Sequence, residues 1–184
     1  MENYEEDIYF SRVGFGHRFG AVIIDGIILA VIGFALKSVL GLKDPTPEDF
    51  AGLGMGEIML LSMKNSTAST LIGVLYMSME IFIRKTPGKM ALGLIIADVS
   101  SNSPAMSALV IRYLFKQASS VFFLLAIVLE SAAFIWIGFA LILVYIIGAF
   151  FALGESKMAL HDIVAKTAVY KEKELEELKN TNSN

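Results

Sequence analysis

Long apolar stretches separated by short polar segments run through the chain. A helix needs about 20 apolar residues to cross about 30 Å of hydrocarbon, and residues 19–40 form such a stretch. A second stretch covers residues 67–83, and the apolar residues 58–61 extend it towards the N-terminus. We therefore predict two membrane-spanning helices in the first half of the chain.

A third apolar stretch, residues 109–153, is too long for a single crossing. We divide it at Glu130 into spans over residues 109–129 and 133–153. Lysine and arginine are enriched in cytoplasmic loops, and four spans place the C-terminal lysines on the same side as the basic loop after the second span, whereas three spans do not. The sequence thus predicts an all-α, polytopic membrane protein, a bundle of four transmembrane helices with both termini in the cytoplasm.

The polar connections carry their own structural signals. In the first, external connection, Thr46 is suited to an N-cap and Pro47 to the first helical position, and acidic residues follow. These residues predict a short external amphipathic helix that runs towards the second span. In the cytoplasmic connection, residues 85–89, Pro87 and Gly88 occupy the second and third positions that a type II turn favours.

Two segments near the cytoplasmic ends of the spans are rich in strand-forming residues, 92–98 and 167–170. We predict a small cytoplasmic strand pair between them. The charges of residues 171–178 alternate as in an exposed helix, and residues 180–184 are expected to be disordered. The predicted organisation is a polar N-terminal segment (1–14), a transmembrane domain (15–170) and a charged cytoplasmic tail (171–184).

The composition narrows the classes of function. The chain has 184 residues, of which 55% are hydrophobic, a net charge of −3 and no cysteine, and its mean hydropathy is +0.65. The lack of cysteine excludes disulfides and thiolate metal sites, and the lack of a basic block argues against nucleic acid as a partner. We expect the lipid bilayer as partner and the cell membrane, in bacteria the inner membrane, as location.

Charged side chains inside or beside the predicted spans are the best candidates for function. A charge at the bilayer centre costs about 3 kcal/mol, so such residues are usually paired and functional. Arg18 and Asp25 lie on one helical face but about 11 Å apart along the axis, too far for a comfortable salt bridge. We therefore expect each to find partners on other helices. The predicted polar cluster comprises Arg18, Asp25, Glu80, Arg112 and Asp162, with Lys116 one turn after Arg112.

Two readings of this cluster stay open. One is a buried ion network that fixes the register of the helices and does nothing else. The other takes Asp25 as a partly desolvated carboxylate beside other acids, which suits reversible protonation in a proton relay or a cation site. Under that reading, Arg18 acts as the competing counter-charge of Asp25.

The remaining polar candidates are weaker. His17 and His161 could bind a divalent metal together with Glu80, but a local hydrogen bond explains an interfacial histidine better, so we predict no metal site and no cofactor. Lys89 follows Gly88 as in a phosphate loop, yet the full loop motif is missing. Neither a Ser/His/Asp arrangement nor an HExxH motif occurs, so we predict that the protein is not an enzyme.

Taken together, these residues resemble the RDD family of small prokaryotic membrane proteins, which is named for one arginine and two aspartates. The resemblance covers about residues 15–170, and Lys166 departs from it at a position where glycine is common. It implies a transport role, with cation/proton antiport proposed for some relatives, and adds Thr86 and Lys89 to the candidate residues. The matching residues are Arg18 and Asp25; Thr86, Pro87, Gly88 and Lys89, with Gly93; Arg112; and Leu160, His161 and Asp162, with Thr167 and Val169.

Our leading hypothesis is therefore membrane transport, in which Asp25 exchanges a proton or a monovalent cation. A non-transporting scaffold or assembly factor is the alternative, and a membrane enzyme acting on lipid head groups is a third class with little support. Four short helices enclose little volume, so we also expect a homo-oligomer.

Overall fold

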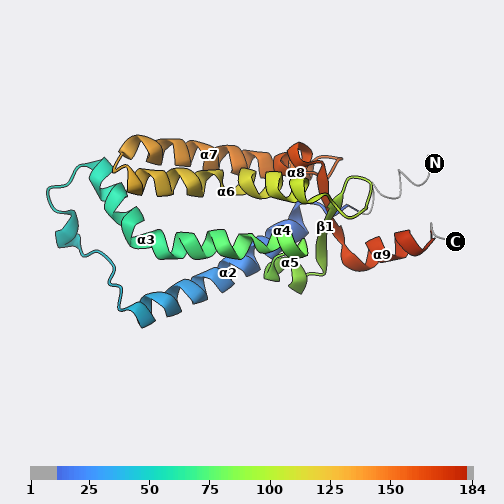
Figure 1. The fold of residues 1–184 in the computed structure, drawn as a ribbon, viewed down its shortest axis with the longest axis horizontal. Coiled ribbons are helices and arrows are strands. Elements are labelled where there is room, and N and C mark those ends of the chain that lie inside the picture. Colours follow the sequence, from blue (N-terminus) through green and yellow to red (C-terminus); the bar gives the residue numbers. More distant parts are fainter. Residues whose placement is uncertain (1–11, 182–184) are drawn as a thin grey trace. The chain divides into compact units, whose positions relative to one another are not determined.

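The computed structural model describes residues 12–181 of the chain. Four of its helical segments are long and apolar enough to cross a membrane (Figure 1). They confirm the four predicted spans and the division near Glu130, and they support a multi-pass membrane protein. The spans are Phe15–Leu40, Met55–Ile83, Met106–Val128 and Ala132–Leu153.

The elements follow each other in a simple order, which Figure 1 traces from blue to red. The spanning helices begin before the predicted spans at their N-terminal ends, because helical hydrogen bonding starts ahead of the apolar core. The α-helices are α2 (Phe15–Leu40), α3 (Met55–Met77), α4 (Met79–Ile83), α5 (Pro87–Ala91), α6 (Met106–Val128), α7 (Ala132–Phe150), α8 (Leu160–Ala165) and α9 (Glu172–Thr181), and the strands are β1 (Leu94–Asp98) and β2 (Thr167–Lys171).

The connection after α2 contains a single 3-10 turn, Pro47–Phe50, and not the predicted amphipathic α-helix. Thr46 caps it in a reciprocal capping box with Asp49, as the sequence indicated. The turn does not continue into α3, because Gly52 follows with a φ of 78°. This left-handed conformation ends the helical path before α3 begins.

The predicted type II turn at residues 85–89 is wrong. A type II turn needs a positive φ at Gly88, but Gly88 lies in the helix α5. Thr86 is the extended N-cap of α5, and its hydroxyl accepts a hydrogen bond from the backbone N–H of Lys89 at 3.4 Å. Pro87 stands at the first helical position, where a missing N–H costs nothing, so the same residues start a helix instead.

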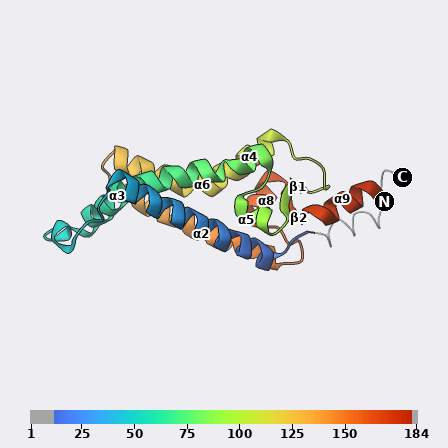
Figure 2. The same ribbon diagram turned by 90° about the horizontal axis from the view of Figure 1, so that it is seen from below.

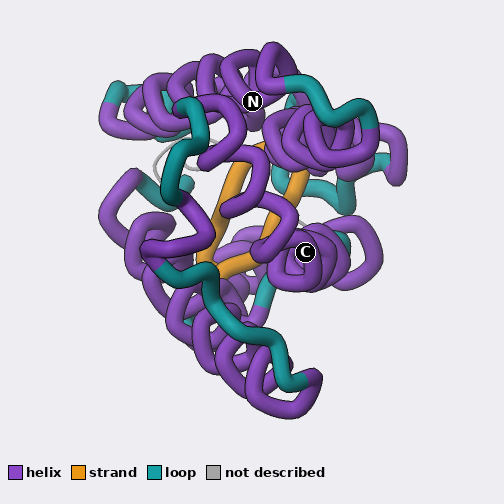
Figure 3. Tube along the Cα trace, turned by 90° about the vertical axis from the view of Figure 1, so that its left-hand side faces the viewer, coloured by secondary structure: helices purple, strands orange, loops and turns teal. Residues whose placement is uncertain are grey.

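The predicted strand pair is confirmed. β1 and β2 are antiparallel, with Ile96 opposite Val169, and run side by side in Figures 2 and 3. Arg12 forms an isolated bridge with Tyr170 at the edge of this pair. Both strands are buried except at their last residues. α5 packs against β1 and α8 against β2 (Figure 2).

The chain divides into two compact units, which we describe separately. The first contains residues up to Gly26, 77–116 and from Tyr145 onwards, and therefore holds the strand pair and α4, α5, α8 and α9. Its buried apolar side chains form two groups, around Ile96 and Val169 and around Ala97 and Tyr170. All five residues of the predicted polar cluster lie within this first unit.

The second unit contains residues 27–76 and 117–144. Within it, the side chain of Lys64 binds Glu130 at 2.7 Å, at the point where the chain turns between α6 and α7. Glu130 itself has a φ of 49° in that turn. The ring of Phe123 packs against the backbone of Gly138, where a Cβ atom would lie 2.6 Å from ring carbon Cδ1. Glycine therefore allows α6 and α7 to pack closely at this level.

The C-terminal tail is helical. The predicted tail helix is confirmed as α9, but it continues through Asn180 to Thr181, where the sequence predicts disorder. Residues 182–184, and most of the predicted N-terminal segment 1–14, lie outside the described residues.

Candidate functional site

Glu80 is a carboxylate of the first unit that pairs with three cations. It lies fully buried on α4. Its Oε1 accepts hydrogen bonds from the Nζ of Lys116, at 2.8 Å, and from the Nζ of Lys89. Its Oε2 lies 3.5 Å from the Nε of Arg112. A single carboxylate thus pairs with three cations, which come from α5 and α6.

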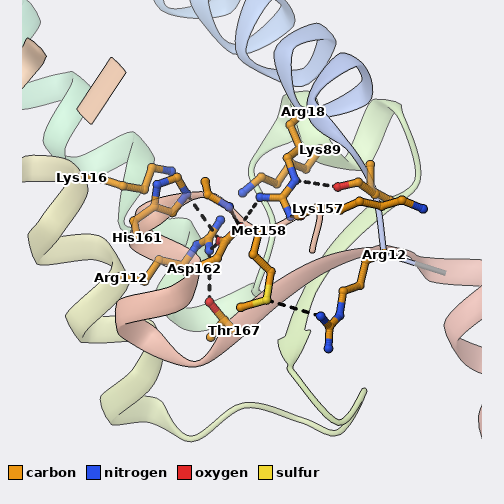
Figure 4. Close-up of polar contacts among 12 residues, drawn as sticks. Arg12, Arg18, Lys89, Arg112, Lys116, Lys157, Met158, His161, Asp162 and Thr167 are labelled. Carbon is orange, nitrogen blue, oxygen red and sulfur yellow. Dashed lines mark hydrogen bonds and ion pairs between the residues drawn. The ribbon is translucent and has the colours of Figure 1, made fainter. Parts of the chain in front are cut away.

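Asp162 forms the second centre, at the start of α8. Its side chain has no exposed surface and makes ion pairs with Arg18 and Arg112, which approach it from two sides in Figure 4. It also accepts a hydrogen bond from the backbone N–H of Ala159 at 3.0 Å, which caps α8. Arg18 is held further by the carbonyls of Val13 and Lys157, both at 2.8 Å. Arg18 therefore finds its carboxylate on another element, as predicted, and that carboxylate is Asp162.

Asp25 is bound in a different way. It lies buried on α2, where its Oδ2 accepts the hydroxyl of Thr86 at 2.6 Å and its Oδ1 accepts the backbone N–H of Gly88 at 2.7 Å. A Cβ atom at position 88 would lie 2.7 Å from the Cγ of Asp25 and would also collide with the carbonyl of Ala21. Asp25 thus fastens the first turn of α5 to α2, and only glycine fits at the contact.

Arg112 links the two centres. It is buried on α6, pairs with both Glu80 and Asp162, and donates a hydrogen bond to the hydroxyl of Thr167 at 3.1 Å (Figure 4). A guanidinium carries five donors in a planar fork, so it can serve several acceptors at once. Arg112 therefore joins α4, α6, α8 and β2 through one side chain.

The two histidines lie in unlike surroundings. His17 is exposed on α2, whereas His161 is buried on α8 and stacks on Tyr145 with ring centroids 5.6 Å apart. Burial, and then the charges of Arg112 and Lys116, hold the pKa of His161 well below its ordinary value. Among residues 12–181, no group of three or more His, Asp or Glu side chains could hold a metal ion, so a metal site built on both histidines finds no support.

Lys89 lies outside the spans and has a strongly lowered pKa. Its side chain is 9% exposed and lies in α5 against Glu80. Burial lowers its pKa to about 7, while the charge of Glu80 opposes that shift and those of Lys116 and Arg112 add to it. Lys89 can therefore gain and lose its proton near neutral pH.

The structure brings every primary candidate into one group, which we call the charged cluster. Thr86 and Lys89, which only the resemblance had indicated, belong to it, and His17 does not. Lys116, which the sequence places one turn after Arg112, also belongs to it, on the same face of α6. Thr167, which the sequence indicated only as part of the resemblance, belongs to it as well. Within the described part of the chain, the charged cluster contains Arg18, Lys89, Arg112 and Lys116 against Asp25, Glu80 and Asp162, with the pair of polar groups Thr86 and Thr167.

With His161 neutral, four positive charges face three negative charges in this cluster, which leaves one positive charge in excess. Arginine stays protonated at any physiological pH. Lys89 is the member whose pKa lies near neutrality, so the loss of its proton would balance the cluster.

Comparison with known proteins places these residues in a family context. The model of the RDD family matches residues 12–166, a range that includes every member of the charged cluster except Thr167. Comparison with curated proteins yields no match. Comparison with solved structures yields none either.

Proposed function

This chain belongs to the RDD family, and we propose that it is a membrane transport protein that exchanges a monovalent cation for a proton at its charged cluster. The observation that carries the proposal is a group of seven ionisable side chains in and beside apolar helices, five of them buried and two, Arg18 and Lys116, only 11% and 12% exposed. Such groups are expensive to place in a membrane and usually mark the path of an ion or a proton.

The cost of the cluster supports a role beyond stability. Desolvating two charges can outweigh their attraction, and apolar replacements of a buried ion network are often as stable or more stable. If the cluster served only to fix the register of the helices, apolar packing such as that around Ile96 and Val169 could do the same. An exchange of one of these cations would explain why the buried Glu80 faces three of them.

Within this proposal, we assign Asp25 a positioning role in place of the proton exchange that the sequence suggested. Two hydrogen-bond donors, from Thr86 and Gly88, already engage both of its oxygens. Its bonds keep α5 on α2, and α5 carries Lys89 to Glu80. We further propose a location in the cell membrane, with both termini cytoplasmic, and assembly with further copies of the chain.

The test is ion flux in proteoliposomes that contain a pH dye. Addition of Na⁺ or K⁺ outside should move protons out of vesicles that carry the wild-type protein, and not out of protein-free vesicles. Glu80→Gln should abolish this movement because it removes the shared carboxylate. Glu130→Gln is the matched control, since Glu130 pairs with Lys64 at an exposed turn outside the cluster. Wild-type vesicles that remain silent with both cations and at several pH values would refute the exchange.

The bonding of Asp25 and Asp162 also favours a second candidate, a non-transporting scaffold. Both carboxylates have several donors, as expected of groups that clamp helices. Such a protein would show no flux in any form, and Glu80→Gln would lower its thermal stability without any other effect. The proteoliposome assay together with a melting curve separates the two functions.

A further inference from the structure

Two ammonium groups share one oxygen of Glu80. The Nζ of Lys116 lies 2.8 Å from Oε1, and the Nζ of Lys89 binds the same atom. The opposite oxygen faces Arg112 at 3.5 Å. An ammonium group is a compact charge of one unit, so its position on a carboxylate is also one that a monovalent metal ion can take.

We propose that the transported monovalent cation binds at Glu80 in the place of the Lys89 ammonium, and that the proton which Lys89 releases is the proton exchanged. This inference rests on the proposed function. It assigns the cation position and the proton carrier to two named side chains on α4 and α5.

The other members of the charged cluster are poorer proton carriers. Arg18 and Arg112 stay protonated. Asp25, Glu80 and Asp162 each accept hydrogen bonds or ion pairs from at least two donors, so their oxygens are already engaged. The pKa of His161 lies well below its ordinary value, so this residue stays neutral near pH 7.

Lys89 also has suitable surroundings for such a step. It lies on α5, a helix of five residues outside the four spans, and Gly93 follows it at a φ of 62°. Burial places its pKa at about 7. The charged and titratable groups around it are Glu80 on α4, Arg112 and Lys116 on α6, His161 and Asp162 on α8, and Arg18 and Asp25 on α2.

The step balances in charge and in atoms. The N–H bond of the Lys89 ammonium breaks, the proton leaves to water, and the amine keeps the electron pair. The metal ion then occupies the oxygen of Glu80 that the ammonium has left. One positive charge replaces another, so the excess of one in the cluster is unchanged, whereas a divalent ion would add a further buried charge. The exchange should therefore favour monovalent ions.

The experiment compares the wild-type protein with Lys89→Met, Lys89→Arg and Lys85→Met. Purified protein in weakly buffered detergent solution receives NaCl, KCl or LiCl, and a pH dye reports the protons released while thermal shift reports cation binding. Lys85→Met is the matched control, because Lys85 has its own carboxylate partner in Glu172, at 2.7 and 2.9 Å. The same four proteins are tested for flux in proteoliposomes.

We expect the wild type and Lys85→Met to release up to one proton for each cation bound. Their cation affinity should fall about tenfold for each pH unit below 7, because proton and cation compete for one place. Lys89→Met should bind the cation without proton release and independently of pH. Lys89→Arg keeps a permanent charge on Glu80, so it should fold and yet lose both binding and flux.

Proton release from Lys89→Met or Lys89→Arg that equals that of the wild type would overturn the assignment. Flux by the wild type with an unchanged pH dependence in Lys89→Met would overturn it while leaving transport intact. Proton-coupled cation binding without flux in the wild type would instead refute transport and leave the binding site standing. If Lys89→Met does not fold, the result for Lys89→Arg decides.

Discussion

Arg112 and Lys116 show how residue type decides the bonding in the charged cluster. Both lie on α6, four residues apart, but only Arg112 reaches Glu80, Asp162 and Thr167 together. Its planar guanidinium directs donors to several acceptors, whereas the ammonium of Lys116 acts as one point charge on Glu80. An Arg112→Lys change would therefore remove the guanidinium that Asp162 and Thr167 now share, and Asp162 would keep only Arg18 as its arginine partner.

His161 leads to a prediction at the same scale. Its pKa is lowered in the folded protein, so below pH 6.5 the unfolded chain binds a proton that the native protein does not. Stability should then decrease as the pH falls from 6.5 to 5.5, by up to about 1.4 kcal/mol per pH unit. His161→Gln should remove this part of the pH dependence, as measured by thermal unfolding in detergent.

The matched control is His17→Gln, because His17 is exposed on α2. That variant should keep the pH dependence of the wild type. An equal slope in His161→Gln and the wild type would show that His161 binds its proton equally in the folded and the unfolded protein, against the burial argument.

Among the elements, α5 is held in position by partners outside itself. Thr86 caps it, Pro87 opens it, and Asp25 on α2 receives the hydroxyl of Thr86 and the N–H of Gly88. A helix of five residues is too short to be stable alone. Its docking on α2 and on β1 therefore supplies the stability that its short length does not.

The close approach of α5 to α2 predicts that Gly88→Ala is destabilising. The added Cβ would lie 2.7 Å from the Cγ of Asp25 and against the carbonyl of Ala21. Because the collision involves backbone and a bound carboxylate, α5 must shift, at a cost of about 1–3 kcal/mol. Thermal unfolding in detergent measures the change.

Gly73→Ala provides the control for that substitution. Gly73 lies within α3, and a Cβ there meets nothing within 4 Å. Alanine is about 1 kcal/mol better than glycine in a helix interior, so this variant should be as stable as the wild type or more stable. Equal melting temperatures for both alanine variants would contradict the close packing at Gly88.

At the scale of the whole molecule, the apolar faces of the long helices define the environment that the protein needs. Phe34 on α2 is 78% exposed and Trp136 on α7 is 59% exposed, and many other large apolar side chains are exposed as well. Apolar patches of this extent mark contact with a membrane or with other proteins. The length and hydropathy of the four spans favour the membrane.

The proposed topology predicts the outcome of cysteine labelling, for which the natural absence of cysteine is convenient. Glu48→Cys, in the exposed connection after α2, should react with a membrane-impermeant maleimide in intact cells. Lys173→Cys, on the exposed side of α9, should react only after the cells are permeabilised. Labelling of Lys173→Cys in intact cells would reverse the predicted orientation of the C-terminus.

The sequence alone determined the four spans, the turn near Glu130, the strand pair and most members of the charged cluster, because hydropathy and residue spacing are local properties of the chain. Only the tertiary structure decided the partners. Arg18 pairs with Asp162, Asp25 binds Thr86 and Gly88, and Glu80 serves three cations. These contacts join segments up to 144 residues apart, and no local pattern specifies which of several buried charges will meet when the helices and the strand pair pack together.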